Sequence, residues 1–212
     1  MALQVSSRPA FTRAERAFTR AEPDARRASL VEACARVLAR EGVAGCSVRA
    51  IALEAGVSPG LVGHYFSGID ALVAETYAHI EAQVSAAIDA ALEAAGSDPR
   101  ARLEAFVTAS FAPPIASGEL LATWIAFWSL VRSRSEIARQ HDEQYARFRA
   151  RLEGLLAECG MPEPQLRRAA IAITALVDGL WLELCLSPQA FSAEEAGAIA
   201  RQALAALTSS GR

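Results

Sequence analysis

The stretch Ser47–Phe66 reads SVRAIALEAGVSPGLVGHYF and predicts two short helices joined by a tight turn. Its first half keeps one helical face apolar with Val48, Ile51, Ala52 and Ala55. Gly56 follows, at a place where many helices end in a left-handed residue without a side chain. Ser58 can then cap a second helix with Pro59 at its first position, where the missing N–H costs nothing. This pattern is typical of a helix-turn-helix, whose second helix enters the DNA major groove.

Leu61, Tyr65 and Phe66 are expected to form the apolar face of the second helix. The residues expected to meet DNA are Ser47, Arg49, Ser58, Pro59, Gly60, Val62, Gly63, His64 and Tyr65. Gly60 and Gly63 each weaken a helix by about 1 kcal/mol relative to alanine, which close approach of the backbone to DNA would explain. Two alternatives to DNA contact stay open: Tyr65 can be a core residue, and Ser47 can serve only as a helix cap.

The charge of the chain is unevenly distributed. The formal net charge is −3, but residues 1–49 hold nine Arg and five acidic residues, which gives +4. The rest has twelve Arg and nineteen acidic residues, which gives −7. The basic part coincides with the helix-turn-helix end, and phosphate attraction is local, so the sequence allows DNA binding.

Residues 1–23 are expected to form a mobile, arginine-containing arm. The hexapeptide AFTRAE occurs at Ala10–Glu15 and again at Ala17–Glu22, too few copies to predict a coiled coil. Such an arm either reaches into the adjacent minor groove or is a loosely packed extension. The arginines available for the groove are Arg8, Arg13, Arg16 and Arg20.

Helical spacing continues through the chain without strand alternation, so the predicted fold class is all-α. Residues 24–70 are expected to form the helix-turn-helix domain and residues 71–212 a larger ligand-binding and dimerisation domain. The helices outside the helix-turn-helix are expected over about 23–40, 70–95, 100–112, 119–132, 136–159, 164–186 and 193–207, with Asp70 as the cap of the second.

Several classes of protein and site are not indicated. The sequence has no metal-ligand spacing, phosphate-binding glycine loop or nucleophile elbow, so we expect no enzyme, no cofactor and no metal. The four cysteines lack CxxC spacing, although Cys46 beside the turn leaves a redox-sensing role open. The apolar segment Ala169–Leu186 is interrupted by polar residues, and the N-terminus lacks a secretory signal. We therefore expect no membrane span and a cytoplasmic location.

Aromatic residues in the second domain predict a ligand site. Trp124 and Trp128 are four residues apart and share a helix face, and Asp178 lies in an apolar helix with Trp181 one turn on. Such rings around a carboxylate suit a quaternary ammonium ligand, because each cation–π contact stabilises the bound cation by about 0.5–2 kcal/mol. Phe106 and Tyr145 complete the expected site. Alternatively, the tryptophans are core and Asp178 bonds a neighbouring helix or a partner subunit.

The motif IAxxAGVSxGxxxxYF, from Ile51 to Phe66, resembles that of the tetracycline-repressor (TetR-type) family of bacterial regulators. The resemblance implies a homodimer on a palindromic DNA operator, released by a small-molecule effector, with the last two long helices of each subunit forming a four-helix bundle. Ile171–Leu186 is apolar nearly all round and needs cover on both sides, which such a bundle would give. Ile69 stands where the family usually has a phosphate-binding lysine.

The segments WIAFW (Trp124–Trp128) and ALVDGLWL (Ala175–Leu182) are similar to those of choline-sensing, BetI-like repressors. This resemblance implies choline or betaine aldehyde as the effector, although Glu183 stands where that subgroup commonly has an arginine. One alternative is a TetR-type regulator of an uncharged apolar ligand, with Asp178 structural. Another is a helical ligand-binding adaptor without DNA binding, which the missing lysine at Ile69 would favour.

Overall fold

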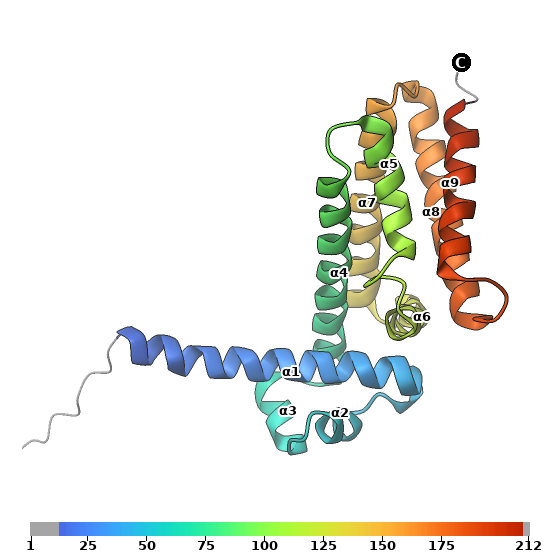
Figure 1. The fold of residues 1–212 in the computed structure, drawn as a ribbon. Coiled ribbons are helices and arrows are strands. Elements are labelled where there is room, and N and C mark those ends of the chain that lie inside the picture. The colour runs from blue at the N-terminus through green and yellow to red at the C-terminus, as the bar shows by residue number, and fades with distance from the viewer. Residues whose placement is uncertain (1–12, 210–212) are drawn as a thin grey trace, which may run out of the picture.

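The computed structural model describes residues 13–209, with side chains from Pro23 to Thr208, and every regular element in this range is a helix. The elements are α1 (Arg13–Gly45), α2 (Val48–Glu54), α3 (Pro59–Tyr65), α4 (Ile69–Ala94), α5 (Pro99–Thr108), the 3-10 helix η1 (Ala109–Phe111), α6 (Gly118–Val131), α7 (Ser135–Glu158), α8 (Glu163–Leu186) and α9 (Ala193–Ser209). Figure 1 shows α1 to α3 as a head across one end of a helical bundle, with α4 running from the head along that bundle. The all-α prediction is confirmed.

Helix α1 begins at Arg13, well before its expected start at Pro23. The residues before Pro23 are rich in Ala, Arg and Glu, which are good helix formers, and Pro23 lies inside the helix. Gly42 breaks the helix with φ 64, where a glycine was expected to end it. Of the arm arginines, Arg8 lies outside the described residues and the other three lie in the first turns of α1. Contact of the arm with a minor groove stays a prediction.

The turn between α2 and α3 forms as predicted, with one difference at the second cap. Ser47 Oγ accepts a hydrogen bond from the Ala50 N–H at 3.2 Å and so caps α2. Gly56 has φ 65, which only glycine adopts without strain. Ser58 is the N-cap residue of α3, but its side chain makes no capping hydrogen bond. The Ser58 hydroxyl is therefore not used by the helix that it precedes.

The buried face of α3 differs from the predicted one. Val62 and Phe66 are 1% and 4% exposed, whereas Leu61 and Tyr65 are only half-buried. Val62 is therefore a core residue, and its placement among the groove candidates was wrong. A helix of two turns has little periodicity of its own, so its rotation is set by the surface of α1 and α2 on which it packs.

Arg27 of α1 fastens the head to the start of the bundle. Its Nε donates to Glu75 Oε1 of α4 at 2.5 Å, and its Nη1 donates to the Tyr65 carbonyl oxygen at 2.9 Å. The same guanidinium lies 4.5 Å from the centre of the Phe66 ring. One side chain thus holds α1, the end of α3 and α4 in a fixed arrangement.

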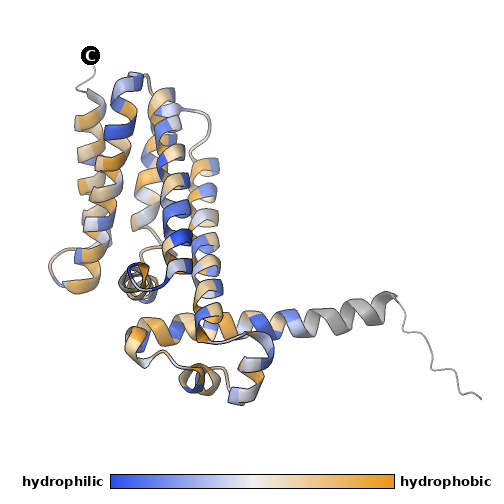
Figure 2. Cartoon of the chain, turned by 180° about the vertical axis from the view of Figure 1, so that it is seen from behind, coloured by the Kyte–Doolittle hydropathy of each residue, from blue (hydrophilic) through white to orange (hydrophobic). Residues whose placement is uncertain are grey.

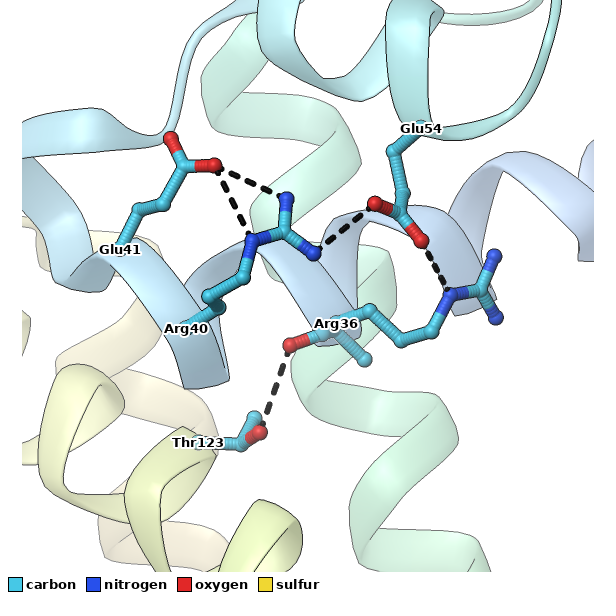
Figure 3. A network of polar contacts seen from close by, with 6 residues as sticks. Arg36, Arg40, Glu41, Glu54 and Thr123 are labelled. Carbon is cyan, nitrogen blue, oxygen red and sulfur yellow. Dashed lines mark hydrogen bonds and ion pairs between the residues drawn. The ribbon is translucent and has the colours of Figure 1, made fainter.

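A second polar network connects α1 with α2 and α6 (Figure 3). Arg36 Nε and Arg40 Nη1 both donate to the Glu54 carboxylate at the end of α2, at 2.7 and 2.9 Å. On the other side of α1, Thr123 Oγ1 of α6 lies 3.4 Å from the Ala35 carbonyl oxygen. Helix α1 is therefore held by the head on one side and by the bundle on the other.

Asp70 does not cap α4, contrary to expectation. The helix starts at Ile69 with Gly68 as the N-cap residue, at φ 146, a conformation that favours glycine. Asp70 lies in the first turn, and its carboxylate pairs with Arg134 just before α7. Because that partner is distant in sequence, local capping rules could not reveal it. The ion pair joins the start of α4 to the bundle.

The helices of the bundle fall close to their expected ranges. The one clear difference is that the helix expected over 100–112 is divided into α5 and η1. The core runs continuously from head to bundle, and its largest fully buried side chains include Tyr77, Phe106, Phe127, Leu152 and Ile173. The bundle and the head therefore share one hydrophobic core.

Helix α8 is long and apolar enough, by length and composition alone, to cross a membrane. In the structure it packs against α6, α7 and α9, as a core helix does, and it contributes buried Thr174 to the interior. Apolar residues recur on α8 and α9, which form one edge of the bundle (Figures 1 and 2). Part of that surface is exposed in the single chain, at Ile171, Leu182, Leu186 and Ile199.

The four cysteines are free thiols. Cys34 is buried in α1, and Cys46 is half-buried between α1 and α2. A hydrogen bond between the two thiols lowers the pKa of Cys46. A redox role for Cys46 stays a prediction.

Candidate functional site

One candidate site is the outer surface of the head. Seven of the eight predicted residues are exposed there, namely Ser47, Arg49, Ser58, Pro59, Gly60, Gly63 and His64. The eighth, Tyr65, is half-buried. Arg27, Arg36 and Arg40 are held in ion pairs with carboxylates of the chain, whereas Arg49 has no such partner among the described residues. Arg49 is thus available to meet a phosphate.

The two glycines of α3 are not required by packing inside the chain. A Cβ at Gly63 would meet no atom within 4 Å, and a Cβ at Gly60 would meet only Ser58 Oγ at 4.0 Å. Neither glycine has a positive φ. The protein could therefore hold alanine at both positions and gain helix stability. Close approach of DNA to this face, which would explain both glycines, stays a prediction.

The end of α3 combines anchored and free groups. The His64 ring is exposed and meets the Tyr65 ring edge-to-face, with centroids 5.2 Å apart. The Tyr65 carbonyl is held by Arg27, while its ring stays half-exposed. Ile69 packs partly against the core of the head and offers no charge to a phosphate. Both readings of Tyr65, core residue and groove residue, remain compatible with this geometry.

The second candidate site is a cavity of about 50 Å³ inside the bundle. Five of the six predicted ligand residues line it: Trp124 and Trp128 from α6, Tyr145 from α7, and Asp178 and Trp181 from α8. These three helices follow one another in the chain, and their packing brings these polar and aromatic side chains to one place. Binding of a ligand by these residues stays a prediction.

Phe106, the sixth predicted residue, does not line this cavity. It is completely buried on α5, and its ring packs on that of Phe148 with centroids 4.7 Å apart. Phe148 lines the cavity in its place, together with Gln144 and Thr174, which the sequence analysis missed. Phe148 lies three residues after Tyr145, so helical spacing from that residue could have found it. Gln144 and Thr174 carry no comparable signal.

Asp178 supplies a carboxylate to the cavity. Its Oδ1 accepts a hydrogen bond from the Tyr145 hydroxyl at 3.0 Å. Burial raises the pKa of Asp178 to about 6, although the Tyr145 hydrogen bond and the positive charge of Arg149 both lower it. Burial, followed by the charge of Asp178, raises the pKa of Tyr145, so its phenol stays a donor. At pH 7 the carboxylate is therefore mostly ionised.

Aromatic rings surround this carboxylate. Trp124 and Trp181 have ring centroids 6.2 Å apart, and Trp124 also meets Tyr77 edge-to-face at 5.3 Å. The Trp181 Nε1 donates to the Ser110 carbonyl oxygen at 2.9 Å, which fixes that ring. Ring faces carry negative potential and attract cations. A small cavity with rings and one carboxylate is suited to a compact organic cation.

Within the described residues, no group of three or more His, Cys, Asp or Glu side chains could hold a metal ion. Glu75 and His79, four residues apart on α4, do not act together. Glu75 pairs with Arg27, and His79 hydrogen-bonds Gln83.

Two family models match the chain. The model of bacterial regulatory proteins of the tetR family matches residues 30–76, and the model of the BetI-type transcriptional repressor C-terminal domain matches residues 99–209. The HTH-type transcriptional regulator BetI of Paraburkholderia phytofirmans is 36% identical over 173 residues, which is 81% of this chain and 87% of that protein. BetI of Paraburkholderia xenovorans is 35% identical over 173 residues, with the same coverage of 81% and 87%.

Solved structures share the fold. A transcriptional regulator of Pseudomonas aeruginosa PAO1 is 41% identical, with a TM-score of 0.79 over 91% of this chain and 94% of that one. A transcriptional regulator of Saccharomonospora viridis in complex with choline has a TM-score of 0.74 over 84% of this chain and 95% of that one. At 18% identity, that second similarity establishes the fold alone.

The glycines of α3 generate a first prediction. Gly63→Ala should raise the free energy of unfolding by about 0.5–1 kcal/mol, because alanine is the better helix former. The same methyl group should weaken binding to the DNA upstream of the coding region, because it would stand between α3 and the groove. Urea denaturation and fluorescence anisotropy with that DNA measure the two effects.

Gly154→Ala is the matched control, because Gly154 is exposed within α7 and a Cβ there would also meet nothing within 4 Å. It should stabilise the protein without changing DNA affinity. If Gly63→Ala binds DNA as tightly as the wild type, the assignment of this face of α3 to the groove is wrong.

A second prediction concerns the stability cost of Asp178. Its folded-state pKa of about 6 lies well above the ordinary pKa of an aspartate, so the folded state holds the proton more tightly. The stability of the free protein should therefore fall as pH rises from about 4 to 6. Asp178→Asn removes this penalty and should stabilise the ligand-free protein at pH 7 by up to about 3 kcal/mol.

Urea denaturation at pH 4 and pH 7 measures the change, and the gain should vanish near pH 4. Asp142→Asn, at an exposed carboxylate on α7, is the control and should change little. A loss of stability in Asp178→Asn at pH 7 would show that the carboxylate supports the fold.

Proposed function

The chain belongs to the TetR family of bacterial regulators, with a BetI-type C-terminal domain, and from this premise we propose that it is a homodimeric repressor released from its operator by a small organic cation. The proposed effector is choline or betaine aldehyde. A regulator of this family binds an operator through its helix-turn-helix and an effector in its C-terminal domain, and it is not an enzyme. The proposed site of action is the cytoplasm.

The observation that carries the effector class is the ionised Asp178 inside an aromatic cavity. Trp124, Trp128 and Trp181 line that cavity with Tyr145, which orients the carboxylate. A quaternary ammonium cannot donate hydrogen bonds, so ring faces and a nearby negative charge are what attract it. Burying a carboxylate is unfavourable unless something compensates it, and a bound cation would do so.

The dimer is supported by apolar surface that one chain leaves exposed. Ile171, Leu182 and Leu186 on α8 and Ile199 on α9 are between 39% and 64% exposed. The same surface on a second copy can cover it through a two-fold axis. Two-fold pairing would also hold two α3 helices at half-sites about one duplex turn apart, roughly 34–36 Å.

A route from effector to DNA is supported by the contacts of α6. Trp124 lines the cavity, and the adjacent Thr123 contacts Ala35 of α1. On the far side of α1, Arg36 holds Glu54 of α2. A displacement of α6 would therefore reach the head through α1. A coupling of about 1–3 kcal/mol between the sites would change operator occupancy about 5- to 150-fold.

An uncharged apolar effector is the competing possibility, because the Tyr145 hydroxyl already satisfies one oxygen of Asp178. Under that alternative the carboxylate is structural. Titration calorimetry with choline and its neutral isostere 3,3-dimethylbutan-1-ol separates the two. We expect choline to bind at least about tenfold more tightly, which corresponds to about 1.4 kcal/mol.

The same titration should depend on pH. Protonation of Asp178 below about pH 6 removes the negative charge, so choline affinity should fall between pH 7 and pH 5. Asp178→Asn should bind choline weakly at both pH values, whereas the isostere should show no such dependence. Equal affinity for choline and the isostere would contradict the proposal that the effector is a cation.

The proposed dimer can be tested by placing a charged side chain on its proposed interface. Leu182→Arg should give a monomer in sedimentation equilibrium, because the guanidinium would be buried between the two copies without a partner. Leu53→Arg is the control, since Leu53 is 84% exposed on α2 in the head, and it should remain a dimer. A dimeric Leu182→Arg protein would place the interface elsewhere.

A further inference from the structure

The hydrogen-bonding groups around the cavity are not all satisfied by the chain. Trp181 Nε1 donates to Ser110, and the Asp178 carboxylate accepts from Tyr145. Trp124 also lines the cavity and is only 2% exposed. Its Nε1 differs from these groups, because it is buried and has no hydrogen-bond partner.

Trp128 provides a useful comparison. Its Nε1 is also unpaired, but the side chain is only half-buried and its N–H lies near the Tyr145 hydroxyl. The ring of Trp124 contacts the rings of Tyr77, Phe127 and Trp181. The Tyr77 hydroxyl is itself engaged by Gln144. Trp124 is therefore the more deeply buried of two tryptophans in this cavity with an unpaired indole N–H.

Buried donors without an acceptor are rare, because such a group gives up its bond to water and gains nothing in return. An indole N–H can only donate. Neither a quaternary ammonium nor its methyl groups can satisfy it. An acceptor atom on a ligand in the cavity can satisfy it.

We propose that Trp124 recognises an oxygen on the effector, donating its Nε1–H to a hydroxyl or carbonyl oxygen while the cationic end faces Asp178. This assignment rests on the proposed function, because it takes the cavity to be the effector site. Trp124 on α6 and Asp178 on α8 line the same cavity of about 50 Å³. A single ligand in this cavity can therefore contact both side chains.

The two contacts recognise different groups of the ligand. Asp178 and the ring faces select a positive charge, whereas Trp124 selects an acceptor a short distance from it. An alkylammonium without oxygen meets the first requirement and fails the second, since it leaves the donor unpaired. Trp124 is thus a specificity-determining residue in addition to a wall of the cavity.

The test compares choline with ethyltrimethylammonium, in which hydrogen replaces the hydroxyl and the cation is unchanged. Titration calorimetry on the full-length wild type should give choline an affinity about 3- to 10-fold higher, the range of one neutral hydrogen bond. Trp124→Phe keeps an aromatic ring and removes the N–H, so the ratio of the two affinities should fall to about one.

Trp181→Phe is the matched control, because the Trp181 N–H is used by Ser110 inside the chain. It can weaken both ligands but should preserve their ratio. An unchanged ratio in Trp124→Phe, or equal affinities in the wild type, would overturn the assignment and leave the cationic effector intact. Failure of both ligands to bind the wild type would overturn the effector class itself, and the assignment with it.

A second measurement needs no change at Trp124. The chain has three tryptophans, so a ¹⁵N-labelled sample shows three indole N–H signals, which Trp128→Phe and Trp181→Phe assign. Choline should move the Trp124 proton downfield relative to ethyltrimethylammonium, because only choline offers an acceptor. Identical Trp124 signals with the two saturating ligands would contradict the hydrogen bond.

Discussion

Helix α8 has more apolar surface than one chain can cover, and much of the structure follows from this constraint. Its inner face packs against α6, α7 and α9 and carries Asp178 and Trp181 into the cavity. Its outer face leaves Leu182 and Leu186 exposed. The same helix therefore carries the proposed ligand site on one side and the proposed dimer surface on the other, so a ligand acting on α8 would also act close to that surface.

The arginines of the head divide into structural and available groups. Arg27, Arg36 and Arg40 contribute to the positive charge of the first 49 residues, yet each is paired with a carboxylate of α2 or α4. These ion pairs hold the head together, and Arg40 in addition meets the adjacent Glu41. The local charge that attracts DNA is thus smaller than the count of arginines suggests, which gives the exposed groups of α2 and α3 more weight.

The cavity of the free protein holds two unfavourable features that a ligand would relieve. Burial raises the pKa of Asp178 to about 6, which means that its ionised form is penalised at neutral pH. Trp124 Nε1 is buried without an acceptor. Groups that reduce stability in the free state and gain partners in the bound state give a ligand differential affinity for one conformation, as a switch between two states requires.

Caps, glycines and helical spacing are local signals, and they were enough to predict the all-α fold, the turn between α2 and α3 and most helix ends. Five of the six residues predicted to bind a ligand line the cavity, among them Trp124 and Trp128, which share a face of α6. The packing of the helices, by contrast, sets three features: Phe148 lines the cavity while Phe106 lies behind it, Val62 is a core residue, and Asp70 pairs with Arg134 instead of capping α4. These outcomes depend on how each helix is rotated against helices distant in sequence, and local periodicity does not contain that information.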